Sequence, residues 1–365
     1  MAVRMDVKGW LVRHKGLWFS LAFGAMGAWL GPVINLPGGS FTGTMLATGL
    51  ANLKLGTLED APAPMQLLAR VLLGLSIGAS VTDETVRTIA HSLAPVSLMI
   101  VAVAAAGVIA GRAMSRHTGM ALPTALCAAA PGALGAMVTL SEDLGGEAPL
   151  VATMHLIRLV STLVIVPMLA TLALPVASPL VGVAGSATVE SALPPLLSIV
   201  LLVVAGIGAG LLGRRLKLPA GDMLVPMAVA AFVNPTWLHI QVFPSALRLY
   251  ANWIIGLGVG ASINRATLVR FRPYARAGTL MTAFLIISGL LMGALLSALT
   301  EIDLLTAVLG CAPGGATALI SLSGELGADA QLVAAMHVTR MVILMVLLPV
   351  LIRAANARVP VHSTS

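Results

Sequence analysis

Long apolar runs separated by short polar stretches dominate this chain. Residues 92–114, 193–212 and 278–299 carry one charged side chain among them, Arg112. About 20 apolar residues in a helix span the roughly 30 Å hydrocarbon core of a bilayer. The pattern therefore predicts transmembrane helices, and it lacks the alternating segments of about ten residues that are typical of outer-membrane barrels.

The first half of the chain contains six such segments. They cover about residues 17–34, 41–53, 65–81, 92–114, 121–140 and 150–172. Basic residues precede the first segment, as in a signal peptide, but the run is long and no small-residue cleavage site follows it. We therefore interpret residues 17–34 as a retained transmembrane helix.

Composition supports a membrane protein. Of the 365 residues, 58% are hydrophobic and 10% are charged, whereas soluble domains have about 25% charged residues. So few charges do not cover a water-exposed surface, which argues against a soluble enzyme and against a DNA-binding domain. The net charge of +7 lies mostly in short loops, where membrane topology places basic residues.

The chain contains one pattern twice. Ala130-Pro131-Gly132 returns as Ala312-Pro313-Gly314, a shift of 182 residues (313 − 131). Polar residues match at the same shift without a gap: Asn52 with Asn234, Ser80 with Ser262, Ser141 with Ser323, His155 with His337 and Arg158 with Arg340. Chance similarity between apolar helices does not match such residues in one register, so the pattern indicates a duplication.

The loop charges indicate that the two repeats are inverted in the membrane. Basic residues at 4–15 precede the first segment, whereas the basic residues at 214–217 follow its counterpart. The loop at 83–87 begins with two acidic residues, whereas its counterpart at 265–276 carries four arginines. Because basic loops favour the cytoplasm, equivalent loops are expected on opposite sides of the membrane.

We predict an all-α, multi-pass protein of a bacterial inner membrane, with both termini cytoplasmic. Its parts are a first repeat at 1–174, a linker at 175–192, a second repeat at 193–353 and a cytoplasmic tail at 354–365. Inversion requires an odd number of crossings per repeat and linker. We therefore expect about five spans per repeat, about ten in all. A broken or re-entrant helix at 121–140 is the favoured non-crossing piece. Segment 41–53 is its rival, and an extra span in the linker is the alternative.

The repeated proline and glycine mark candidate binding sites. Pro131-Gly132 and Pro313-Gly314 interrupt apolar segments, since proline lacks a backbone donor. Such breaks occur where the freed groups face protein or a watery cavity, and broken helices in inverted repeats are typical of secondary transporters. The alternative is a packing kink.

Arg158 and Arg340 are the candidate anion-binding side chains. Each lies about ten residues, or roughly 15 Å, into its segment, and buried arginines normally face the bundle interior with a partner. The functional interpretation is a site for an anion, most naturally a carboxylate. The structural alternative pairs the arginines with Asp143 or Glu325, which also match at the same shift and are candidates for coupling or gating.

Several other polar pairs are candidates for coupling or gating. His155 and His337 lie one helical turn before the arginines and relay a proton, gate the site or form hydrogen bonds between helices. Asn52 with Asn234, and Ser80 with Ser262, either coordinate a cation or join helices. We predict no metal site, no cofactor and no role for Cys127 or Cys311. Gly74-x-x-x-Gly78 and Gly256-x-x-x-Gly260 indicate close helix packing.

These motifs resemble the duplicated domain of the bacterial AbrB membrane family. The second copy is the more similar, with Ala312-Pro313-Gly314-Gly315, Glu325-Leu326-Gly327-Ala328-Asp329 and residues 333–340. The first copy has Ala133 and Glu147 where the second has glycine and aspartate. The resemblance implies a fold similar to cation/proton antiporters and bile-acid symporters. The family also carries the names "putative ammonia monooxygenase" and "AbrB family transcriptional regulator".

Two functional hypotheses follow. The first is a secondary transporter of a small organic anion, coupled to protons or sodium, with its site between the repeats. The second is a membrane sensor that affects gene expression indirectly, without transport. We do not expect an enzyme, because a monooxygenase requires a clustered metal site, and we expect no nucleic-acid partner. The lipid bilayer, an anion and a coupling cation are the expected partners, and a homo-oligomer stays open.

Overall fold

The fold is that of a computed structural model of the whole chain. It describes residues 15–81, 83–132, 134–173, 194–216, 218, 220–238, 240 and 243–356. The linker at 175–192, the basic residues before Lys15 and most of the tail at 354–365 lie outside the described residues.

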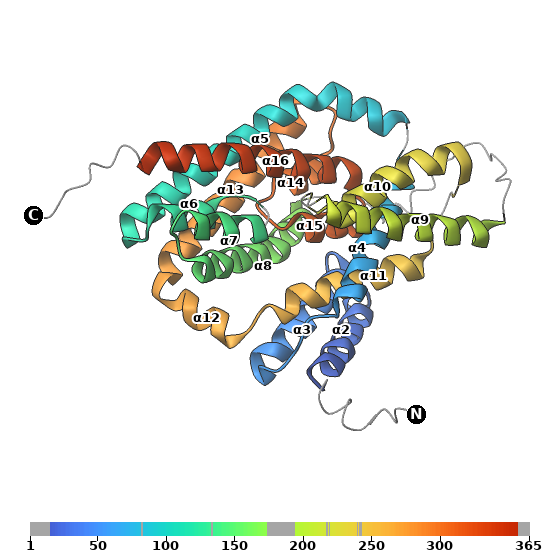
Figure 1. Cartoon of the computed structure of the whole chain (residues 1–365), viewed down its shortest axis with the longest axis horizontal. Coiled ribbons are helices and arrows are strands. Elements are labelled where there is room, and N and C mark those ends of the chain that lie inside the picture. The colour runs from blue at the N-terminus through green and yellow to red at the C-terminus, as the bar shows by residue number, and fades with distance from the viewer. Residues whose placement is uncertain are drawn as a thin grey trace, which may run out of the picture. The chain divides into compact units, whose positions relative to one another are not determined.

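Within the described residues, every regular element is a helix (Figure 1). These helices form two compact units. Neither unit coincides with one sequence repeat, because each contains helices from both halves of the chain. The predicted repeats at 1–174 and 193–353 are therefore not the same as the two structural units. They stay a prediction from the sequence.

The first unit contains the first helices of each half. They are α2 (Lys15–Val33), α3 (Gly39–Leu55), α4 (Ala63–Gly78), α9 (Pro195–Arg215), α10 (Gly221–Val233), the π-helical turn η1 (Asn234–Leu238) and α11 (Ser245–Ala261). Residues Ile320–Gly327, which include the end of α15 (Ala316–Leu326), also belong to this unit.

Glycines let the helices of the first unit approach one another closely. A Cβ atom on Gly74 or Gly78 of α4 would lie 2.2 or 2.1 Å from the carbonyl oxygens of Met223 and Met227 on α10. A Cβ atom on Gly256 of α11 would lie 2.8 Å from a carbonyl oxygen of α3. The close packing that the glycine spacing predicts is confirmed at these positions.

The second unit contains the remaining helices. They are α5 (Asp83–Thr118), α6 (Leu122–Ala129), α7 (Leu134–Asp143), α8 (Ala148–Ala173) up to Val166, α12 (Arg265–Phe271) from Thr267, the 3-10 turn η2 (Arg272–Tyr274), α13 (Ala275–Leu299), α14 (Leu304–Cys311), the start of α15, and α16 (Ala330–Asn356).

Both predicted helix breaks are present in the second unit. The first separates α6 from α7, and the second separates α14 from α15. A glycine of a long helix packs on each: a Cβ atom on Gly107 of α5 would lie 3.0 Å from Cδ of Pro131, and one on Gly289 of α13 would lie 3.2 Å from Cδ of Pro313. Bulkier side chains on α5 and α13 would displace the breaks.

Helix bounds in the two halves share the spacing of the sequence motifs. Helix α6 begins at Leu122 and α14 at Leu304, which are 182 residues apart (304 − 122). The same interval separates the first residues of α7 and α15, and those of α8 and α16.

Five described segments are long and apolar enough to cross a membrane. They are Lys15–Val33, Ala94–Thr118, Ala148–Leu169, Leu196–Arg215 and Arg265–Leu299. Helices α4 and α15 are apolar but shorter. The protein is therefore membrane-like in character, while the total of about ten spans and their direction stay predictions.

Candidate functional site

Arg158 forms hydrogen bonds with the carbonyl groups at the end of α6, just before the first helix break. Its Nη1 donates to the carbonyl oxygens of Ala128 and Ala129, and its Nη2 donates to that of Ala130, each at 3.0 Å. These carbonyls end α6, where no further turn of helix satisfies them. The guanidinium is 2% exposed, so the break at Pro131 depends on this side chain for its hydrogen bonds.

Arg340 does the same at the second break. Its Nη1 donates to the carbonyl oxygens of Ala312 at 3.0 Å and Cys311 at 3.5 Å. The side chain is 2% exposed. The two arginines therefore play equivalent parts at the ends of α6 and α14.

Each arginine is held by the histidine one turn before it. Nδ1 of His155 lies 3.1 Å from Nη2 of Arg158, and Nδ1 of His337 lies 2.6 Å from Nη2 of Arg340. The other ring nitrogen, Nε2, contacts the carbonyl oxygen of Cys127 or Leu309. A carbonyl only accepts and a guanidinium only donates, so each imidazole is neutral, with its proton on Nε2.

The arginines bond to backbone carbonyls and not to carboxylates. Asp143 is exposed at the end of α7. Among the described residues, the ion pairs all involve Asp222, which contacts Arg70 and Arg214. The carboxylate pairing considered for Arg158 and Arg340 is therefore not seen within the described part of the chain. Both Nε atoms are buried and make no hydrogen bond there.

Helix α8 also contacts the second break. Oγ1 of Thr162 lies 3.5 Å from the carbonyl oxygen of Pro313, and a Cβ atom on Gly314 would lie 3.4 Å from Cγ2 of Thr162. A Cβ atom on Gly315 would lie 3.1 Å from Cδ1 of Leu159. The helix that carries Arg158 therefore passes beside Pro313 and Gly314, which places candidates from both halves of the chain in one unit.

Asn52 and Asn234 join helices in the first unit. The amide Nδ2 of Asn52 donates to the carbonyl oxygen of Ala261 at 2.6 Å, and its Oδ1 accepts from the N–H of Leu58. Asn234 makes the equivalent contacts with Ala79 and Ile240. Because both polar atoms of each side chain are engaged, the contacts favour joining helices over coordinating a cation.

Ser80 and Ser262 lie at the ends of α4 and α11. The hydroxyl of Ser80 donates to the carbonyl oxygen of Ile77 at 2.9 Å, and that of Ser262 donates to Gly258 at 2.8 Å. Both hydroxyls therefore bond to a carbonyl oxygen of the preceding helical turn.

Glu325 lies at the other end of α15, in the first unit. Its carboxylate accepts hydrogen bonds from the hydroxyl of Ser40 at 2.9 Å and from the N–H of Phe41 at 3.2 Å. Nδ2 of Asn252 also donates to it, and Oδ1 of Asn252 accepts from Ser321, each at 2.5 Å. The acidic side chain of the last turn of α15 thus caps the first turn of α3.

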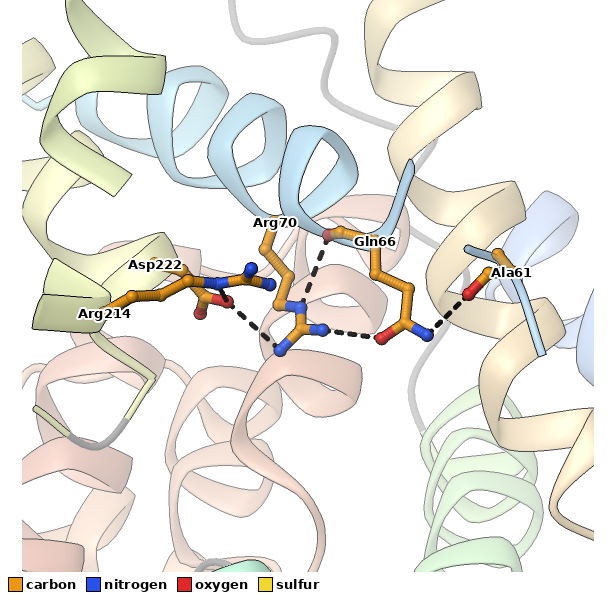
Figure 2. Close-up of polar contacts among 5 residues, drawn as sticks. All are labelled: Ala61, Gln66, Arg70, Arg214 and Asp222. Atoms are coloured by element: carbon orange, nitrogen blue, oxygen red, sulfur yellow. Dashed lines mark hydrogen bonds and ion pairs between the residues drawn. The ribbon is translucent and has the colours of Figure 1, made fainter. Parts of the chain in front are cut away.

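The first unit also contains a charged cluster around Asp222 that the sequence alone did not predict (Figure 2). Oδ2 of Asp222 lies 3.2 Å from Nη1 of Arg70 and 3.2 Å from Nε of Arg214. Arg70 also donates to Gln66, which in turn donates to the carbonyl oxygen of Ala61. The cluster joins α4, α9 and the start of α10.

Comparison with known proteins identifies the family. The family model described as "Transition state regulatory protein AbrB" matches residues 42–356. The chain belongs to the AbrB family. It is 26% identical over 335 residues to "Putative regulator AbrB" of Escherichia coli (strain K12), covering 90% of this chain and 93% of that protein. It is 25% identical over 352 residues to "Uncharacterized protein YhjN" of Bacillus subtilis (strain 168), covering 92% and 91%.

The candidate residues of this AbrB-family chain fall into two groups. Those of the second unit are Pro131, Gly132, His155, Arg158, Pro313, Gly314, His337, Arg340 and Asp143. Those of the first unit are Asn52, Ser80, Asn234, Ser262 and Glu325. One feature of the sequence could have revealed the Asp222 cluster. At the shift of 182 residues, Asp222 is equivalent to Ser40 and Arg70 to Asn252 (222 − 40 = 252 − 70 = 182). Ser40 and Asn252 are the residues that bind Glu325.

No metal centre is assembled from the described residues. Among them, no group of three His, Cys, Asp or Glu side chains is placed to hold a metal ion. Cys127 and Cys311 are buried in α6 and α14, and their carbonyl oxygens, not their thiols, contact His155 and Arg340.

Proposed function

We propose that this AbrB-family protein is a secondary transporter of a small organic anion, coupled to a proton or sodium ion. It lies in a bacterial inner membrane with both termini cytoplasmic, and its two repeats are inverted. The substrate class follows from the charge at the helix breaks, and the transport mechanism follows from the repeats.

The observation that carries the proposal is a pair of buried arginines without carboxylate partners. Arg158 and Arg340 lie in one unit, each is 2% exposed, and each keeps an unpartnered Nε–H group. A buried, uncompensated cation is costly unless a counter-ion joins it. A carboxylate substrate would supply that counter-ion, with the guanidinium groups held in place by the carbonyls and histidines.

The helix breaks add to the attraction for an anion. Helices α7 and α15 restart after Pro131-Gly132 and Pro313-Gly314. The free N–H groups and the dipole at a helix start favour negative charge. Broken helices in inverted repeats hold substrates in this way in transporters of known type.

Repeat organisation supports alternating access. The helix bounds recur at the interval of the sequence motifs, as α6 and α14 illustrate, and the loop charges change sign between halves. We infer two inverted repeats, with a fold similar to that of cation/proton antiporters and bile-acid symporters. Two inverted repeats that exchange conformations would open one site to each side of the membrane in turn.

Regulation without transport is the second candidate. It is favoured by the names of the family and of the Escherichia coli relative, which contain the words "regulatory" and "regulator". In this hypothesis the arginine site binds an anion but does not move it, and gene expression responds indirectly.

The test measures binding and flux in the same preparation. Purified protein is screened by thermal shift against lactate, succinate and citrate, and uptake of the radiolabelled anions is measured in proteoliposomes. Arg158→Gln and Arg340→Gln remove a buried positive charge, whereas Arg116→Gln removes an exposed one from the same unit and is the control. Size-exclusion chromatography checks that each variant is folded.

We expect uptake of at least one anion, lost in both buried variants and retained in Arg116→Gln. Stabilisation by an anion without uptake would favour the sensor. Uptake that persists in folded Arg158→Gln and Arg340→Gln would overturn the arginine site.

A further inference from the structure

The carboxylate of Glu325 is surrounded by hydrogen-bond donors from two other helices. Ser40 and Phe41 belong to the first turn of α3, and Asn252 belongs to α11. Asn252 is itself fixed, since its Oδ1 accepts from Ser321 of α15. The last turn of α15 is therefore tied to α3 and α11 through one partly buried acid.

No cationic side chain neutralises this acid among the described residues. The ionisable groups on the helices around it are Lys15 on α2, Lys54 on α3, and Arg248 and Tyr250 on α11. The lysines and Arg248 are exposed, and the hydroxyl of Tyr250 donates to the carbonyl oxygen of Met65. Within the described part of the chain, none of these groups contacts the Glu325 carboxylate, whose hydrogen-bond donors there are all neutral.

The ligand that suits this site is a proton and not a metal cation. Hard cations such as sodium or calcium are held by several oxygen ligands. Here Phe41 and Asn252 present N–H groups, and the oxygen of Asn252 is occupied by Ser321. A metal ion would meet donors, whereas a proton only has to join a carboxylate oxygen.

The equivalent position in the other half of the chain has a different chemistry. At the start of α10, Asp222 replaces Ser40, and Arg70 replaces Asn252 (222 − 40 = 252 − 70 = 182). Two guanidinium groups fix the negative charge of Asp222 (Figure 2). The counterpart of Glu325 is Asp143, which is exposed. Of these two equivalent sites in the described chain, the one at Glu325 therefore has an acid whose partners are neutral donors, whereas the one at Asp222 has an acid paired with two guanidinium groups.

We propose that Glu325 binds and releases the coupling proton, and that its protonation detaches the end of α15 from the start of α3. The proposal rests on the proposed transport function. A proton from water on one side joins a carboxylate oxygen, which then donates instead of accepting and loses its hydrogen bond from Phe41 or Asn252. Release of the proton to water on the other side restores the contact.

Infrared difference spectroscopy tests the proton site without any substrate. The C=O stretching band of a protonated carboxylic acid is followed between about pH 5 and about pH 9, a range in which exposed carboxylates stay charged. We expect a titrating band that Glu325→Gln abolishes and that Asp143→Asn, at the equivalent exposed position, retains.

Two substitutions of Asn252 must shift the titration in opposite directions. Asn252→Arg copies the Arg70 pairing and should lower the midpoint by about one to three pH units, because a cation favours the carboxylate. Asn252→Leu removes a donor and should raise it. A band that neither variant moves, or that persists in Glu325→Gln, overturns the proposal, as does release of the proton by sodium at constant pH.

A flux measurement separates this proposal from the transport function. In proteoliposomes, an imposed pH gradient should drive anion uptake by the wild type, whereas Glu325→Gln should exchange anions at a rate that ignores the gradient. Wild-type protein that shows the infrared titration but no flux refutes transport and leaves the proton site. Gradient-driven uptake by Glu325→Gln refutes the proton site and leaves transport.

Discussion

Nη2 of Arg158 lies 3.1 Å from Nδ1 of His155, and this contact assigns the proton of the imidazole. Because the guanidinium donates to Nδ1, the ring proton lies on Nε2, which faces the carbonyl oxygen of Cys127 at 2.8 Å. A further proton on Nδ1 would face Arg158 and break the contact. The histidine therefore positions the arginine, and the proton-relay interpretation loses support.

The first prediction concerns His155→Gln. This change keeps a side-chain donor but loses the rigid link between Cys127 and Arg158, so we expect a loss of about 1–3 kcal/mol in unfolding free energy. The pH dependence of anion uptake should stay that of the wild type. Thermal unfolding and uptake measured over a pH series check both parts.

His337→Gln is the matched variant, since His337 makes the same contacts with Leu309 and Arg340. It should behave like His155→Gln. If the pH dependence of anion uptake changes in either folded variant, the histidines relay a proton and the positioning interpretation is wrong.

The second prediction tests whether Asn52 joins helices, which we call the clamp interpretation, or coordinates a sodium ion. Asn52→Asp keeps an acceptor for the N–H of Leu58 but no longer donates to the carbonyl oxygen of Ala261. Leaving that buried group unpaired should cost about 1–3 kcal/mol. Thermal unfolding should show this loss equally with and without sodium.

Asn234→Asp should lose at least as much stability, because Nδ2 of Asn234 donates to two carbonyl oxygens, of Ala79 and Ile240. If sodium restores the stability of either variant, a cation binds there and the clamp interpretation is wrong.

The sequence predicts the skeleton of the site better than its contacts. Pro131 and Pro313 mark the helix breaks because proline interrupts a helix wherever it stands. The partners of Arg158 escape prediction because they are backbone carbonyls, which every residue has. The cluster of Asp222 and Arg70 could not be predicted for another reason. These residues differ in type from their equivalents, Ser40 and Asn252, so identity between the repeats does not mark them.

The third prediction compares two glycines in packed helices. Gly74→Ala would place a Cβ atom 2.2 Å from the carbonyl oxygen of Met223. Relief requires α4 and α10 to separate, and overpacking of this kind typically costs about 1–3 kcal/mol. Gly208 on α9 has no atom within 4 Å of an added Cβ, so Gly208→Ala should stabilise the helix by up to about 1 kcal/mol. Thermal unfolding in one detergent measures both, and equal effects would refute the close contact.

The fourth prediction concerns Asp329, which lies just before α16. Oδ1 of Asp329 accepts from the N–H groups of Gln331 and Leu332 at 3.0 and 2.9 Å. Burial raises the pKa of Asp329 above its ordinary value and the nearby carboxylate of Asp303 raises it further, while the two N–H groups lower it. The folded protein therefore binds this proton more tightly than the unfolded chain does.

The sign of the pH effect follows from this raised pKa. The stabilisation from protonation is complete below the unfolded value of about 3.9 and is lost as the pH rises through the folded value, so the charge is unfavourable at neutral pH. Asp329→Asn keeps an oxygen to accept both hydrogen bonds and carries no charge. We expect it to be more stable than the wild type at neutral pH, with the difference shrinking on acidification. Asp329→Ala, which loses the cap, should cost about 1 kcal/mol.

Thermal unfolding of both variants over a pH series measures these differences. Glu147→Gln makes the same acid-to-amide change at the equivalent, exposed position 182 residues earlier (329 − 147) and controls for the change itself. A wild type that is more stable than Asp329→Asn at neutral pH, and that loses this advantage as the pH falls, would show that the N–H groups of α16, and not burial and Asp303, dominate the carboxyl group. In that case the charged cap holds α16 in place at neutral pH.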